Sequence, residues 1–401
     1  MSKVACSLIV GFSLLGFETG FAAGTSGTNF LFFPPENLTK QSSLAWIGEA
    51  LVHSISSQLG NPGVEFLSRE TRLSLVEDAD LPPNAPLSRA SMIRVAQLGE
   101  ADELVFGLCS GNENSLRVIL HVLDMKTMKL GTEIISVGPA SNLAEMENEL
   151  AWGILVQRGL QGGESREVFR NRTRKVSNAA YALFVLGLGA PDEEGRIKLL
   201  QEAVDKHEDF PEALAQLGRH YFKKGDCARA VQRLEGVLDR EKFYREAQLM
   251  LGTCYCKLGI NSKAIRAYSE LLAFDPPMEV LNNLGVAYLR EGNLPLATDH
   301  LKRALRMEET NGVVMVNLAI LRYLQGDYPA ALSLLEEALK TNASHALGHY
   351  LRSRVLRERG DSVKSAEALA QAIRLGVDPE KLNLDDPQNW TQIFMSPAHI
   401  Q

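Results

Sequence analysis

Few residues in this 401-residue sequence have the types and spacing that catalysis or metal binding requires. His345 and His349 lie four positions apart, so one helix face could present both imidazoles to a metal ion. No carboxylate or cysteine lies nearby in sequence, and His349 falls at a helix-packing position, which favours a structural role. The run Asp192-Glu193-Glu194 is more typical of a solvated turn than of an acid–base pair. Phosphate-loop, His-Glu-x-x-His and Gly-x-Ser-x-Gly motifs are absent from the sequence, so we predict no catalytic residue, no metal site, no cofactor and no enzymatic activity.

The cysteines could form a cross-link between two helices. Cys254 and Cys256 lie on a predicted helix, where ~100° per residue turns their side chains roughly 200° apart, so they are poorly placed to bind one metal ion. Cys227 begins the preceding helix, which should run antiparallel to theirs and start near them. A disulfide between Cys227 and either Cys254 or Cys256 could therefore form, and buried free thiols are the alternative.

The elements that position these residues follow a repeat. Glycines precede a turn at intervals of 33 or 34 residues, at Gly225, Gly259, Gly292, Gly326 and Gly360. A fixed period of this length is typical of stacked helix–turn–helix units, in which glycine ends a helix in the left-handed conformation. Small residues recur in the same phase and let paired helices approach closely. They are Gly218, Gly252, Gly285 and Ala319 in the first helix, and Ala230, Ala264, Ala297 and Ala331 in the second.

This pattern of Leu-Gly, Tyr, Gly and Ala resembles the tetratricopeptide repeat. The resemblance covers about half of the chain, residues 177–379, as about six repeats, the four central ones being the most regular. It implies an all-α superhelical solenoid that binds a protein or peptide partner. Residues 380–401, with Trp390, Ile393 and Phe394, are expected to form a capping tail over the end of the stack.

The resemblance also implies that a partner lies on the concave face, lined by the first helix of each hairpin. By phase, twelve residues are expected there: Gln216, Arg219, Lys223, Met250, Thr253, Lys257, Asn282, Asn283, Val286, Arg290, Asn317 and Tyr323. Asn283 and Asn317 match the family's common asparagine, which is placed to bond a peptide backbone. The basic members favour acidic or carboxyl-terminal segments. A solvated helix face without a ligand is the alternative.

Residues 28–160 have a different pattern, which predicts a small α/β domain. The apolar run of residues 29–33 ends at Pro34-Pro35, as a buried strand would, and Ser43 could cap a helix that ends at Gly60. Alternating residues around 116–124 and 130–137 predict a hairpin, and residues 143–156 an amphipathic helix. Residues 161–176 should then be a linker. The overall class is α+β, a small α/β domain followed by the solenoid.

This first domain resembles the TolB amino-terminal-like domain of bacterial envelope proteins. The resemblance rests on three segments, residues 32–38 (FFPPENL), 45–51 (AWIGEAL) and 99–107 (GEADELVFG). It implies an envelope location and a scaffold or adaptor role without catalytic residues.

The amino terminus reads as an export signal. Lys3 precedes an apolar stretch from Val4 to Phe17, and Gly20-Phe21-Ala22 suits cleavage after Ala22, so residues 1–22 are predicted to be a signal peptide. An uncleaved anchor or a buried strand is the alternative. No later segment is apolar for the ~18 residues that a membrane span needs. The net charge of -7 argues against nucleic acid as a partner.

These observations predict a non-enzymatic interaction scaffold, exported to the periplasm or cell envelope, that binds a partner on the concave repeat face. The rival reading is a small-ligand sensor or enzyme that uses the amino-terminal α/β domain, with a crevice near Pro34 to Thr39.

Overall fold

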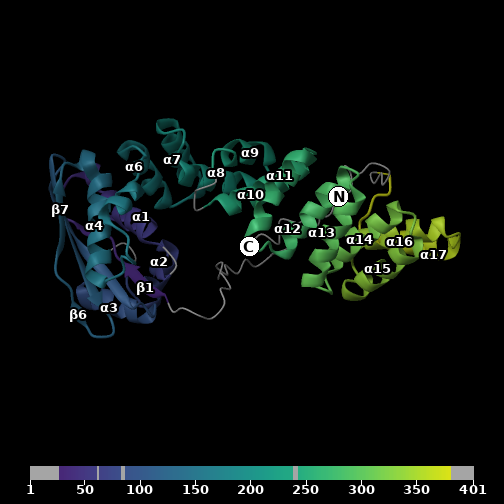
Figure 1. Ribbon diagram of the computed structural model, residues 1–401, viewed down its shortest axis with the longest axis horizontal. Helices are drawn as coiled ribbons and strands as arrows, with labels where there is room; N and C mark the ends of the chain where they lie inside the picture. Colours follow the sequence, from purple (N-terminus) through teal and green to yellow (C-terminus); the bar gives the residue numbers. More distant parts are fainter. Residues whose placement is uncertain (1–26, 61–62, 83–85, 238–242, 381–401) are drawn as a thin grey trace, which may run out of the picture. The chain divides into compact units, whose positions relative to one another are not determined.

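The computed structural model describes residues 27–60, 63–82, 86–237 and 243–380. Its contacts divide the described chain into two units, one reaching to Ala213 and one starting at Leu214. A small sheet with covering helices comes first in sequence, and a long series of helix pairs follows (Figure 1). The predicted α+β class, a small α/β domain followed by helical repeats, is confirmed.

The sheet of the first unit combines parallel and antiparallel strands. Its main path runs β3-β1-β4-β5-β6, with β2 paired to β4 and β7 paired to β5. The strands β3, β1 and β4 are parallel, whereas β5 pairs with β4, β6 and β7 in antiparallel fashion. The strands are β1 (Thr28–Phe32), β2 (Glu36–Asn37), β3 (Val64–Phe66), β4 (Glu103–Asn112), β5 (Ser115–Asp124), β6 (Lys129–Leu130) and β7 (Ile134–Gly138).

Helices cover both faces of the central strands, which explains why residues 30–33, at the end of β1 and just beyond it, are all apolar. Phe30 and Phe32 join the cluster that contains residues of α1 (Ile47–Leu59) and α4 (Leu143–Arg158). Leu31 lies in the opposite cluster, with residues of α2 (Arg69–Asp78) and α3 (Arg89–Leu98). A strand buried on both faces must be apolar at every position, not at alternate ones.

The helices that follow α4 pack against the same unit. Residues 161–176, expected as a linker, contain the short helices α5 (Arg166–Phe169) and η3 (Arg170–Arg172), and Phe169 is fully buried. The pair α6 (Asn178–Leu188) and α7 (Glu193–Lys206) belongs by contacts to the sheet-containing unit, although its sequence groups it with the repeats.

Buried polar contacts explain why α6 joins the sheet-containing unit. The hydroxyl of Tyr181 lies 2.8 Å from Nδ1 of His53 on α1. Arg174, just before α6, forms an ion pair with the fully buried Glu147 of α4, with Nε and Oε2 3.1 Å apart. The Arg174 guanidinium also lies 4.0 Å from the centre of the Tyr181 ring. The contacts of Tyr181 with His53 and of Arg174 with Glu147 join residues that are far apart in sequence, so pattern alone did not predict them.

Helix pairs make up the second unit, and α8 runs across the boundary between units. The helices are α8 (Pro211–Lys223), α9 (Cys227–Leu234), α10 (Tyr244–Lys257), α11 (Asn261–Leu271), α12 (Met278–Arg290), α13 (Leu294–Met307), α14 (Gly312–Leu324), α15 (Tyr328–Thr341), α16 (Ala346–Glu358) and α17 (Ser362–Arg374). The five turn glycines all have φ between 74° and 80°, the left-handed conformation that the period predicted. No helix in the described ranges is long and apolar enough to cross a membrane.

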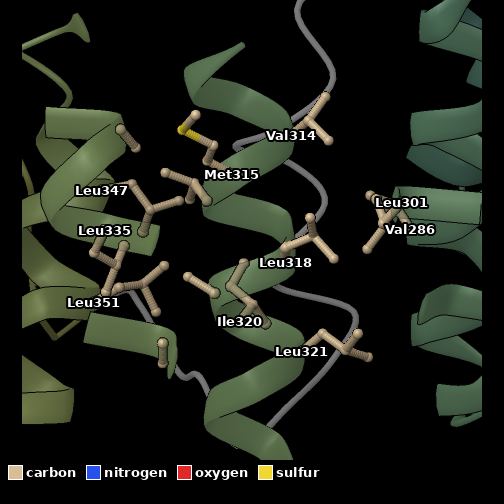
Figure 2. Packing of buried hydrophobic residues seen from close by; sticks show 14 of the residues in the cluster. Val286, Leu301, Val314, Met315, Leu318, Ile320, Leu321, Leu335, Leu347 and Leu351 are labelled. Atoms are coloured by element: carbon tan, nitrogen blue, oxygen red, sulfur yellow. The ribbon is translucent and has the colours of Figure 1, made fainter. Parts of the chain in front are cut away.

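Close packing of small residues sets the spacing within each pair. A Cβ atom added at Gly252 would lie 2.6 Å from the ring of Tyr268, and one at Gly285 would lie 2.7 Å from Leu301. Apolar side chains fill the seams between successive pairs. Figure 2 shows Val314, Leu318 and Leu321 of α14 pointing toward Val286 and Leu301, with Leu335, Leu347 and Leu351 on the other side of α14.

Candidate partner-binding face

All twelve predicted partner-binding residues lie on the first helices of the pairs, α8, α10, α12 and α14. We call this side of the second unit the first-helix face. Six of the residues are exposed or half-buried: Gln216, Arg219, Lys223, Lys257, Asn283 and Tyr323. The other six are buried: Met250, Thr253, Asn282, Val286, Arg290 and Asn317. The buried ones form the seams of the stack, because α10, α12 and α14 contact one another directly.

A chain of hydrogen-bonded amides and hydroxyls crosses these seams. Thr253 Oγ1 and Tyr268 Oη are 3.0 Å apart, and Asn283 Nδ2 donates to the same Tyr268 oxygen at 3.3 Å. Asn282 Nδ2 donates to Asn283 Oδ1 at 3.1 Å, and Asn317 Nδ2 donates to Asn282 Oδ1 at 2.8 Å. We call these five residues the amide chain. It joins three successive repeats through side chains alone.

The amide chain has one unsatisfied end and one accessible member. Asn317 is fully buried, and its Oδ1 accepts no hydrogen bond from the described residues. Asn283, in contrast, is half-buried, so its amide lies where the chain meets the surface. A primary amide offers both donors and an acceptor, which is the pattern that a peptide group requires.

Sequence reasoning missed Tyr268, the central member of the amide chain. It lies on the second helix α11, at the position where the other pairs carry Leu234, Leu301 and Leu335. The sequence signal that could have identified Tyr268 is a tyrosine at a repeat position where the other pairs carry leucine. Burial raises the pKa of the Tyr268 hydroxyl well above its usual range, so this group stays protonated and can donate and accept at once.

The basic lining is weaker than the sequence suggests. Arg219 binds both carboxylate oxygens of Glu246 on α10, at 2.7 and 2.5 Å, so a neighbouring carboxylate already offsets its charge. Arg290 is buried and donates to the carbonyl of Cys256 and, at 3.1 Å, to Asn261 Oδ1. Among the four basic residues predicted there, Lys223 is exposed and Lys257 half-buried.

The remaining candidates are structural in the described chain. His345 caps α16 by accepting the amide proton of Gly348 at 3.0 Å, and a ring nitrogen of His349 lies 2.9 Å from the carbonyl of Ala343. Asp192 caps α7. Within the described ranges, no cluster of three or more His, Cys, Asp or Glu residues could hold a metal ion.

Local hydrogen bonds fix the conformation of the segment after β1, where a ligand crevice was considered. Asn37 Nδ2 donates to the carbonyl of Leu44 at 2.9 Å, and its Oδ1 accepts from the hydroxyl of Thr39 at 2.6 Å.

The structure distinguishes between the two cysteine partners that the sequence left open. The four described cysteines are free thiols, and all are buried. The side chains of Cys227 and Cys254 lie within hydrogen-bonding reach of each other. Cys256 lies elsewhere on α10, and burial raises its pKa to about 12.

Comparison with known proteins identifies the repeats. Residues 215–279, 257–311 and 288–355 match models described as tetratricopeptide repeat, which confirms that the chain contains such repeats. No curated protein matches the chain. A solved structure of YrrB, described as a TPR protein with an unusual peptide-binding site, is 17% identical, with a TM-score of 0.36, covering 44% of this chain and 92% of that chain. A structure of MamA is 19% identical, with a TM-score of 0.36, covering 40% of this chain and 94% of that chain.

Proposed function

We propose that this chain is a non-enzymatic interaction scaffold whose first-helix face binds an extended peptide segment of a partner protein. The amide chain is the observation that carries this proposal. It extends polar hydrogen-bonding capacity across three tetratricopeptide repeats and reaches the surface at Asn283. Side chains that bond to one another in this way hold their orientation before a partner arrives, which lowers the entropy cost of binding.

The exposed and half-buried groups of this face indicate the chemistry of the partner. The Asn283 amide suits a backbone peptide group, and the ammonium groups of Lys223 and Lys257 suit acidic side chains or a terminal carboxylate. Because Arg219 already binds Glu246, the electrostatic contribution comes from the two lysines. Such surface attraction changes association rates more than affinity and weakens with salt.

A pull-down with matched variants tests this function. The test variant combines Lys223→Glu with Asn283→Ala, and the control is Lys302→Glu, which changes the charge of an exposed residue on the second helix α13. Arg219 is left intact, because Arg219→Glu would place two carboxylates together and disturb the α8–α10 seam. Partners captured from native extract are quantified by mass spectrometry after circular dichroism has verified the helix content of each variant. Partners should be lost with the test variant and retained with the control. Identical partner profiles for all three proteins would contradict binding on this face.

The proposal extends to location and to the first domain. Residues 1–22, which lie outside the described residues, act as a cleaved signal, and the α/β domain is a TolB amino-terminal-like adaptor domain of the envelope. Support comes from the apolar stretch before Ala22 and from the three matching segments of the domain. Fractionation of cells expressing the full chain, followed by intact-mass measurement, should find a periplasmic product beginning at Ala23. A cytoplasmic product that retains the first 22 residues would contradict export.

A further inference from the structure

We infer that Cys227 and Cys254 are a dithiol–disulfide pair that links α9 to α10 when a disulfide donor oxidises it. This inference does not depend on the proposed partner binding, because it rests on the positions of the two thiols. The residues are 27 positions apart in sequence and lie on successive repeats.

The fold brings the two sulfurs together and separates them from the other thiols. Cys227 is the first residue of α9, which packs against α10, and the Cys254 side chain of α10 lies within hydrogen-bonding reach of it. Cys227 is 6% exposed, whereas Cys254 is fully buried, so Cys227 is the member that solvent reaches. Cys109 lies in the core of the sheet-containing unit, far along the chain from both.

The surroundings suit Cys227 to be the attacking sulfur. The interaction with Cys254 and the nearby Lys257 ammonium outweigh the effects of burial and of Asp226, and together they lower the pKa of Cys227 to about 7. The amino-terminal end of α9 also favours negative charge. In contrast, burial raises the pKa values of Cys109 and Cys256 to about 12. Cys227 is thus the described cysteine whose pKa is lowered.

Oxidation proceeds by two thiol–disulfide exchanges. The Cys227 thiolate attacks one sulfur of the donor disulfide, whose S–S bond breaks and releases one donor thiolate. The Cys254 thiol then loses its proton, and its sulfur attacks the Cys227 sulfur and displaces the second donor thiolate. Two protein thiols are oxidised to one disulfide, the donor is reduced to two thiols, and the protons of Cys227 and Cys254 end on those thiols.

The bond would lock the seam between two repeats. The same seam carries the Arg219–Glu246 ion pair of the first-helix face, between α8 and α10. A cross-link from α9 to α10 therefore holds the helices that present this ion pair in one arrangement. The disulfide also restricts the unfolded chain, since it closes a loop between positions 227 and 254.

Oxidised glutathione serves as the probe. The full chain is incubated with excess oxidised glutathione, quenched in acid, alkylated and digested with trypsin. Cleavage after Lys224, Arg229, Arg245 and Lys257 yields a peptide carrying Cys227 and another carrying both Cys254 and Cys256. Fragment ions that break at Tyr255 then assign the link. We expect a Cys227–Cys254 disulfide, alkylated Cys109 and Cys256, and a melting temperature about 5 °C higher that returns to its starting value on reduction.

Three variants sharpen the test. Cys254→Ser should accumulate glutathione on Cys227, Cys227→Ser should leave all remaining thiols alkylatable, and Cys256→Ser should form the disulfide as the wild type does. Circular dichroism verifies that each variant is folded. The peptide map of the wild-type protein tests the Cys227–Cys254 link even if a variant does not fold. A link to Cys256, or a Cys227 that stays fully alkylatable after prolonged incubation, would overturn the inference.

Discussion

Replacing Gly252 with alanine should destabilise the second unit, although alanine is the better helix former. The new Cβ atom would lie 2.6 to 2.8 Å from three atoms of the Tyr268 ring. Real Cβ atoms do not come this close, so the ring or one of the helices must move. Tyr268 is fully buried, and its hydroxyl bonds to Thr253 and Asn283, so any displacement strains the amide chain as well.

Two unfavourable contributions and one favourable contribution set the size of the change in the free energy of unfolding. Overpacking a core costs about 1–3 kcal/mol, and each weakened hydrogen bond of the Tyr268 hydroxyl costs about 0.5–1.5 kcal/mol. Glycine to alanine in a helix contributes about 1 kcal/mol in the opposite direction. We therefore expect Gly252→Ala to lower the free energy of unfolding by about 1–5 kcal/mol.

Urea unfolding followed by circular dichroism measures this change. Gly187→Ala is the matched control, because Gly187 also lies in a first helix, and its new Cβ would meet Leu199 at an ordinary contact distance of 3.4 Å. That control should be neutral or should stabilise by up to about 1 kcal/mol.

A double-mutant cycle isolates the contact. In a Tyr268→Ala background the cost of Gly252→Ala should fall, because no ring remains at the position that the new Cβ atom would approach. A Gly252→Ala protein as stable as the wild type, or an equal cost in both backgrounds, would refute the close-packing argument.

Three further changes test the packing and the buried charges. Arg174→Met should lower stability by about 3–5 kcal/mol, since it leaves the Glu147 carboxylate buried without its cation; adding Glu147→Gln should recover part of the loss in a thermal melt. Burial raises the pKa of Glu103 to about 7, above its unfolded value, so the free energy of unfolding should fall by about 1–3 kcal/mol as the pH rises from about 4.5 to 7. Urea titrations at several pH values should show this dependence, and Glu103→Gln should remove it. Leu318→Ala should cost about 2–5 kcal/mol by leaving a cavity beside Val286, measured by urea unfolding, with exposed Leu296→Ala expected to change little.

The repeats were predictable from the sequence because their constraints are local. A left-handed turn requires a residue such as Gly225, and a close helix crossing requires one such as Gly252, and both needs recur at a fixed spacing. The apolar run of β1 was equally informative, since a strand covered on both faces needs apolar residues throughout.

The exposure of the first-helix residues was not predictable in the same way. Helical phase alone places Asn282, Asn283 and Asn317 on the same face of the first helices. The packing of the neighbouring first helix decides which of them is buried, and Asn282 and Asn317 are. The role of Arg290 depends on a backbone carbonyl of the preceding repeat, which no pattern of residue types specifies. The packing of α6 on α1 depends on contacts such as that of His53 with Tyr181, 128 positions apart.

The attachment of α6 to the sheet-containing unit limits how this protein can be divided. A fragment cut at residue 160 would keep the Glu147 carboxylate and lose Arg174, and one cut at residue 176 would lose the Tyr181 hydroxyl that bonds to His53. Recombination that replaced the repeats from residue 177 onward would also destabilise the sheet-containing unit, because the incoming segment would need to supply an equivalent of Tyr181. Gain or loss of whole repeats during evolution should therefore be tolerated most easily beyond residue 213, where each helix pair packs only against the neighbouring pairs.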